Sequence, residues 1–284
     1  MSQIVGVICK DTVVMAGESQ ATAGSMKELD ALKIYSIDFE DNGALIAFCG
    51  GIAPAFRVID DIKREANGKS LDSEWAAVNL AQKSIKNFHR NVLGLYNLPD
   101  MPEDRQRALF ERDENFFQLM IAHFYRYKAY LYTIDSITAQ AQPCSRFAAI
   151  GIASRISKFF LSQIDASRMT WQTGLTLAID TIEHVKGIDA FCGGPVSVAV
   201  VERGRKRTMP FPNHFTERIC KKLNAENNQL GVARTQAYER VIADIYKEID
   251  EAFEKSRQAE KQWEEDCSKL REQEDKRSQH NTSQ

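Results

Sequence analysis

The stretch SQIVGVICKDTVVMA, residues 2–16, decides the fold of this chain. It contains two β-branched, apolar runs, residues 3–9 and 12–16, which are separated by two residues only. Two such runs joined by so short a connection predict a β-hairpin that is buried on at least one face. Ser2 therefore stands at the start of a strand pair in the core.

The rest of the chain up to about residue 210 alternates between groups of strands and pairs of amphipathic helices. Strands are predicted at 33–38, 43–49, 116–123, 129–134, 147–151, 196–201 and about 206–210, and helices at about 54–66, 72–93, 154–165 and 171–186. This order fits an α+β fold in which two antiparallel sheets stack and helices cover their outer faces, a four-layer αββα sandwich. It does not fit a doubly wound parallel sheet.

The apolar pattern predicts one large domain over residues 1–225 and a helical extension over 226–275. Residues 94–114, which hold two prolines and many charges, have no clean period and are predicted to be an exposed insertion. In the extension, an i, i+3, i+4 stripe predicts an extra C-terminal helix; its residues are Tyr238, Val241, Ile242, Ile245, Ile249 and Phe253. Residues 276–284 are expected to be disordered.

The composition is that of an ordinary soluble protein. Of 284 residues, 43% are hydrophobic, and 37 basic side chains nearly balance 39 acidic ones, so neither nucleic acid nor a membrane surface is an expected partner. With no apolar run of eighteen residues and no signal sequence, a cytoplasmic location is expected. Six cysteines without a CxxC pair and five histidines without ligand spacing predict no metal and no cofactor.

Ser2 is the first candidate for chemistry. If Met1 is removed, Ser2 carries a hydroxyl group and a free α-amino group on one residue. An α-amino group has a pKa of about 7.7–8.0, so near neutral pH it can act as the general base for the hydroxyl of its own residue.

Several segments in order resemble the β-type subunits of the proteasome and the related bacterial heat-shock peptidase that forms stacked rings, which are N-terminal-nucleophile hydrolases. The segments are Ile4 to Gly24, FCGGIA at residues 48–53, AIG at residues 149–151 and DAFCGG at residues 189–194. The similarity covers about residues 2–202.

The resemblance implies a role for each matching residue. Ser2 would be the nucleophile, Lys33 the catalytic lysine, and Glu18 would stand where the family has an aspartate that holds this lysine. The N–H of Gly50 would stabilise the oxyanion. Asp189 and Cys192 would orient the amine of the nucleophile.

The sequence departs from the family pattern at three of these positions and at residue 152. Ser2 replaces the usual threonine, and Glu18 replaces an aspartate and is one methylene longer. Cys192 and Ile152 stand where the family has serines that support the amine, and cysteine is a weak hydrogen-bond partner. These changes predict either a degraded site or a specialised one.

The resemblance also implies how a substrate binds. An extended peptide would pair with the strand edge at Gln20, Ala21 and Thr22, and Phe48 and Ile52 would line the specificity pocket, although both are equally plausible as core residues. The expected partners are a peptide or unfolded protein as substrate, further copies of the chain in one or two homo-oligomeric rings, and an ATP-driven unfoldase. The chain has no GxxxxGK[ST] segment of its own for ATP.

Three functions stay open at this point. The first is a peptidase with Ser2 as nucleophile. The second is an amidohydrolase for small amides on the same fold, which would be favoured if the oligomer enclosed no chamber. The third is a structural or regulatory ring subunit without activity, which the replacements at residues 18, 152 and 192 favour.

Overall fold

The computed structural model describes residues 2–23, 26–28, 31–93, 116–165, 169–204, 208–229, 251 and 253–262. The chain divides into two compact units, residues 1–239 and 240–284. In the second unit, residues 251 and 253–262 are helical. The insertion predicted at 94–114, the tail at 276–284 and most of the extension predicted at 226–275 lie outside the described residues.

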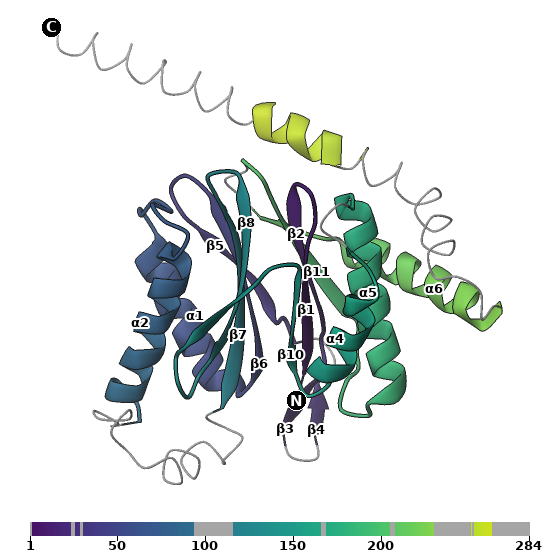
Figure 1. Cartoon of the computed structure of the whole chain (residues 1–284), viewed down its shortest axis with the longest axis horizontal. Helices are drawn as coiled ribbons and strands as arrows, with labels where there is room; N and C mark the ends of the chain where they lie inside the picture. Colours follow the sequence, from purple (N-terminus) through teal and green to yellow (C-terminus); the bar gives the residue numbers. More distant parts are fainter. Residues whose placement is uncertain are drawn as a thin grey trace, which may run out of the picture. The chain divides into compact units, whose positions relative to one another are not determined.

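The first unit contains two five-stranded antiparallel sheets (Figure 1). The first sheet has the order β10-β1-β2-β11-β12, with β1 Gln3–Ile8, β2 Thr12–Glu18, β10 Phe147–Gly151, β11 Val196–Glu202 and β12 Met209–Pro210. The second has the order β5-β6-β7-β8-β9, with β5 Ile34–Asp38, β6 Gly43–Gly50, β7 Phe117–Tyr125, β8 Lys128–Asp135 and β9 Ala141–Cys144. A small hairpin of β3 Ala21–Ala23 and β4 Met26–Glu28 stands apart from both.

Helices cover the outer face of each sheet, as Figure 1 shows. The helices α1 Ile52–Ala66 and α2 Ala76–Asn91 pack on the second sheet. The helices α4 Ser154–Ser162, α5 Trp171–Ile188 and α6 Asn213–Gln229 lie with the first sheet, where α5 contacts β1 and β2. The predicted αββα sandwich of two antiparallel sheets is therefore confirmed. None of the helices within the described ranges combines the length and the hydropathy needed to cross a bilayer.

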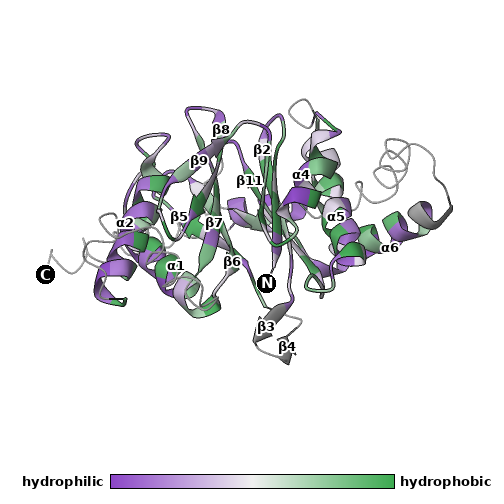
Figure 2. Cartoon of the chain, turned by 60° about the horizontal axis from the view of Figure 1, so that its bottom comes forward, coloured by the Kyte–Doolittle hydropathy of each residue, from purple (hydrophilic) through white to green (hydrophobic). Residues whose placement is uncertain are grey.

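Two hydrophobic cores follow from the alternation of side chains along β6. Ile46 and Phe48 point toward α1 and α2 and join one core, whereas Leu45 and Cys49 point toward the first sheet and join the other. Figure 2 shows the hydrophobic residues gathered in the strands and on the inner faces of the helices. The two faces of the same strand thus build the two interfaces of the sandwich.

The opening hairpin forms as its sequence predicts. Val5 of β1 pairs with Ala16 of β2, and every residue of β2 is buried. Because β1 lies between β2 and β10, Gln3 at its start is directly opposite Gly151 at the end of β10. This register brings the N-terminal segment next to the turn that precedes α4.

The pattern of the sequence did not predict β3, β4 or β9. The first two strands are only three residues long, too short for a period to appear. The strand β9 contains Pro143, which is unfavourable inside a sheet because it lacks an N–H donor. It is accommodated because β9 lies at the edge of the second sheet.

Candidate functional site

Ser2 is buried beside the turn that follows β10. Its relative exposure is 6%, and its carbonyl oxygen accepts a hydrogen bond from the Ile152 N–H at 3.1 Å. Gly151 has a φ of +104°, and a Cβ atom built there would lie 1.8 Å from the Ser2 oxygen. Only glycine therefore allows this approach of the two backbones.

Two glutamine side chains fix the ends of β1 and β10. The Gln3 Nε2 donates to the Ser157 hydroxyl of α4 at 2.8 Å, and Gln3 is fully buried. The Gln118 Oε1 accepts from the Gly151 N–H at 3.2 Å. Neither glutamine was a predicted site residue. The available signal was a polar residue at the start of one apolar run, for Gln3, and inside another, for Gln118.

Glu18 and Lys33 form a buried ion pair across the site. The Lys33 Nζ lies 2.8 Å from the Glu18 Oε1, and the two side chains are 3% and 0% exposed. Lys33 precedes β5 directly, and its ammonium group also donates to the Gln20 carbonyl. The structure thus brings together the two charged residues that the sequence singled out.

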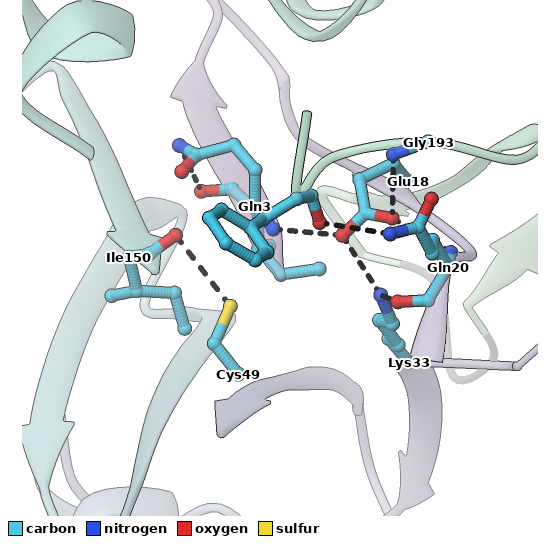
Figure 3. A network of polar contacts seen from close by, with 9 residues as sticks. Gln3, Glu18, Gln20, Lys33, Cys49, Ile150 and Gly193 are labelled. Atoms are coloured by element: carbon cyan, nitrogen blue, oxygen red, sulfur yellow. Dashed lines mark hydrogen bonds and ion pairs between the residues drawn. The ribbon is translucent and has the colours of Figure 1, made fainter. Parts of the chain in front are cut away.

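The Glu18 carboxylate accepts four hydrogen bonds from four different segments (Figure 3). Its Oε1 accepts from the Lys33 Nζ and from the Gln3 N–H at 3.0 Å. Its Oε2 accepts from the Gln20 N–H at 2.6 Å and from the Gly193 N–H at 3.3 Å. A carboxylate has room for about four such bonds, so Glu18 is fully occupied. It links the residue after Ser2 to Lys33 and to the loop at 189–194.

Gly50 ends β6 with a φ of +101°, and a Cβ atom there would lie 2.3 Å from the Phe116 carbonyl oxygen. The Phe48 N–H donates to the Lys33 carbonyl at 3.1 Å, at the start of β5. Because alternate N–H groups of a strand face the same neighbour, the Gly50 N–H faces the same edge, beyond the end of β5. Gly50 thus directs an amide toward the side on which Lys33 lies.

Two buried thiols interact electrostatically with the Glu18–Lys33 ion pair. The Cys49 Sγ contacts the Ile150 carbonyl oxygen at 3.5 Å, and burial raises its pKa well above the ordinary value. Cys192 packs against Ala153, and burial, together with the negative charge of Glu18, raises its pKa to about 12. Both thiols are therefore neutral near pH 7, and the Cys192 thiol is a weaker donor than the serine hydroxyl that the family has at this position.

Asp189 follows α5 and orders the loop to which it belongs. Its Oδ1 accepts from the Phe191 N–H at 2.9 Å, and its carbonyl accepts from the Cys192 N–H at 3.0 Å. The carboxylate therefore stabilises the turn that carries Cys192. The side chain of Ile152, the residue that replaces a serine of the family, is exposed.

The two residues predicted to line the specificity pocket, Phe48 and Ile52, differ in their burial. Phe48 is 2% exposed in the core next to α1, and its ring contacts Tyr35 and Phe56, so it fills the core and does not line an open pocket. Ile52 is half-buried against the same core. The reason is the alternation of β6, in which Phe48 faces the helices and Cys49 the other sheet.

The remaining predicted residues lie beyond the ion pair. Ala21 and Thr22 belong to β3, whose backbone alone is described. Gln20 is 4% exposed, and its side chain donates to the Phe191 carbonyl at 3.2 Å. Its amide is therefore directed into the loop at 189–194.

Comparison with known proteins shows a similarity to proteasome subunits. The family model described as "Proteasome subunit" matches residues 2–96. Among curated proteins, the proteasome subunit beta of Methanococcus aeolicus is 26% identical over 70% of this chain and 83% of its own length. The proteasome subunit beta 1 of Thermococcus gammatolerans is 24% identical over 72% of this chain and 92% of its own length.

Solved structures share the fold at low sequence identity. Anbu, an ancestral beta-subunit, from Yersinia bercovieri has a TM-score of 0.58 at 12% identity and covers 82% of this chain and 99% of its own. Anbu from Pseudomonas aeruginosa, solved as a helical assembly of the Anbu complex, has a TM-score of 0.59 at 15% identity, with the same coverage.

The two stacked sheets, the helix layers and the buried start of β1 define an α+β protein with the N-terminal-nucleophile hydrolase fold. The matching sequences narrow this class further. The chain is similar to the proteasome β-type subunits, and the proteasome family model matches its residues 2–96.

Proposed function

We propose that this protein is a peptidase whose nucleophile is Ser2 after removal of Met1. The observation that carries the proposal is the Glu18 carboxylate, which accepts from the Lys33 ammonium and from the Gln3 N–H. This carboxylate fixes a buried cation and the residue next to the nucleophile with the same oxygen. A buried ion pair contributes little net stability, so such an arrangement favours a functional role over a purely structural one.

The chemistry follows from the groups that surround Ser2. The Ser2 Oγ would attack the carbonyl carbon of a peptide bond while the freed Ser2 amine takes the hydroxyl proton. The C–N bond would then break, the amine would return the proton to the leaving nitrogen, and water would hydrolyse the resulting ester. The positive charge of Lys33 would favour the alkoxide-like transition state.

Gly50 is the proposed oxyanion donor. Its N–H faces the edge of β6 beyond the end of β5, and a Cβ atom at position 50 would clash with the Phe116 carbonyl oxygen. A backbone N–H held by a strand end needs no reorganisation when negative charge develops on the substrate oxygen. Asp189 would support the amine indirectly, because it orders the turn that carries Cys192.

We further propose that copies of the chain assemble into one or two rings that act on peptides or unfolded proteins, with an ATP-driven unfoldase as partner. The support is the relationship to proteasome beta subunits. The helical assembly of the Pseudomonas aeruginosa complex makes an open helical arrangement the natural competitor of a closed ring. Mass photometry and negative-stain images of the full chain would distinguish the two.

A ring subunit without activity is the second candidate, and two observations favour it. Cys192 is a neutral thiol where the family has a hydroxyl, and the Asp189 carboxylate bonds to its own loop. An amidohydrolase for small amides is the third candidate, and it would be favoured if the purified oligomer enclosed no chamber.

The deciding experiment is the intact mass of the purified protein after incubation with a peptide epoxyketone, a reagent that captures both the hydroxyl and the amine of an N-terminal nucleophile. We expect a protein without Met1 that carries one inhibitor on Ser2. The Ser2→Ala variant is the control and should stay unmodified. Retention of Met1, or a free Ser2 that never reacts, would overturn the peptidase proposal in favour of a subunit without activity.

A further inference from the structure

The Gln20 side chain connects the segment after β2 to the loop at 189–194. Its Nε2 donates to the Phe191 carbonyl at 3.2 Å, and its N–H donates to the Gly193 carbonyl at 3.0 Å. Next to it, the Ser19 N–H donates to the Pro195 carbonyl at 3.0 Å. Residues 19 and 20 therefore bond to this loop and its C-terminal end three times, and two of the three bonds come from Gln20.

The absence of a side chain at Gly193 provides the space that the Gln20 side-chain amide occupies. A Cβ atom built at Gly193 would lie 2.3 Å from the Gln20 Oε1, well inside contact distance. Because Gln20 is only 4% exposed and its Nε2 is bonded to Phe191, its amide cannot move aside without losing that hydrogen bond. The glutamine and the glycine therefore fit each other as a pair.

The backbone of Gln20 belongs to the ion pair itself. Its carbonyl accepts from the Lys33 ammonium, and its N–H is shared between Glu18 and Gly193. Glu18 in turn accepts the Gly193 N–H at 3.3 Å. One residue thus touches the cation, the carboxylate and the loop that carries Cys192.

We infer that Gln20 is a positioning residue, which locks the 189–194 loop against the Glu18–Lys33 pair through the contact of its side chain with Gly193 and Phe191. This assigns its side chain a different role from binding the substrate. Only the expected effect on kinetics rests on the proposed function. The contacts of Gln20 that hold the loop are present whether or not the protein is a peptidase.

The kinetic test separates positioning from substrate binding. In Gln20→Ala, we expect the maximal rate of epoxyketone labelling (kinact) to fall about fivefold to tenfold, the effect of one lost hydrogen bond, with the half-saturating concentration (KI) within about twofold. Gln82→Ala is the matched control, because the Gln82 Nε2 also donates to a backbone carbonyl, that of Ala139, at 2.7 Å. It should leave both constants unchanged. A raised KI with an unchanged kinact in Gln20→Ala would overturn the inference.

A double-mutant cycle tests the pairing of the two residues. Gly193→Ala would place a methyl group where the Gln20 amide lies, so we expect it to lower kinact about as much as Gln20→Ala does. In the double variant, the methyl group meets no amide, and the fall should match that of either single change instead of their product. Multiplying effects would show that the two residues act independently and would contradict the inference.

Hydrogen exchange tests the lock without reference to activity. We expect the amide protons of residues 191–193 to exchange about tenfold faster or more in Gln20→Ala than in the unchanged protein or in Gln82→Ala. Gln20→Met, which keeps the volume but lacks the donor, should behave like the alanine variant. Unchanged exchange in both variants would overturn the inference. If the unchanged protein never reacts with the epoxyketone, but residues 191–193 still exchange faster in both Gln20 variants, the proposed function fails. The structural role of Gln20 in holding the loop is then still supported.

Discussion

Glu18→Gln is the most informative substitution for stability, because the chain contains an exposed ion pair of the same length for comparison. The Lys33 Nζ to Glu18 Oε1 distance is 2.8 Å and that from the Lys83 Nζ to the Glu65 Oε2 is 2.7 Å. The Lys33 side chain is 3% exposed, whereas that of Lys83 is 58% exposed. The two pairs therefore differ in burial and hardly in geometry.

The magnitude follows from this difference in burial. Removing one partner of a buried pair leaves an uncompensated charge and costs about 3–5 kcal/mol. The amide introduced by Glu18→Gln would retain an oxygen acceptor, but its NH₂ group would place donors where the Gln20 and Gly193 N–H groups now donate. In Glu65→Gln the freed lysine stays in water, so the expected cost is about 0–1 kcal/mol.

The assay is urea unfolding of each variant at one fixed protein concentration, followed by tryptophan fluorescence. We expect Glu18→Gln to lose about 3 kcal/mol or more of the free energy of unfolding, and Glu65→Gln less than about 1 kcal/mol. The double variant Glu18→Gln with Lys33→Met removes both charges and should recover part of the loss. Equal losses in the two single variants would refute the reasoning, since burial would then not decide the cost.

Three further predictions concern other parts of the fold. Burial lowers the pKa of His123 to about 4, so the unfolded chain binds more protons than the folded protein between about pH 6.5 and 4. Up to about 3 kcal/mol of stability should therefore be lost as pH falls through this window. Urea unfolding as a function of pH measures this loss, and a His123→Phe variant whose stability falls with pH at the same slope would contradict the prediction. Gly151→Ala should destabilise the protein far more than Gly68→Ala. Both positions have positive φ, but only a Cβ atom at 151 meets a backbone oxygen, at 1.8 Å. Similar midpoints of urea unfolding for the two variants would show that the backbone moves away from the new Cβ atom at little cost, which would contradict the prediction. The buried Cys49 thiol should resist iodoacetamide until the protein unfolds, as mapped by mass spectrometry, and rapid alkylation of the folded protein would contradict this.

The layers of the fold could be predicted from the sequence because most elements have a strong period. The strand β1, the helix α5 and their neighbours carry apolar residues at the spacing of buried strands and amphipathic helices, and these elements appear within a few residues of the predicted bounds. The sequence did not predict strand β9 because Pro143 interrupts the strand pattern. A proline is accommodated at the edge of a sheet, but the position of β9 at that edge depends on contacts that are distant in the sequence.

The site was predictable only where charge was conspicuous. Glu18 and Lys33 are charged residues next to apolar runs, and the structure brings them together. The loop contacts of Gln20 and the packing of Phe48 into the helix-side core could not be predicted from the chain. Both depend on the face of the strand toward which a side chain points and on the distant segments that pack against that face. A single sequence does not determine either of these.

The site around Ser2 also has a place in the order of folding. Its contacts join segments that are far apart along the chain, since Glu18 and Gly193 are separated by 175 residues. During synthesis the N-terminal segment leaves the ribosome first, and contacts of such separation form late because a long loop must close. The carboxylate, the cation and the loop thus meet only when the sandwich is complete. A nascent chain carries Ser2 from the beginning, yet it gains the surroundings that could activate this residue only at the end.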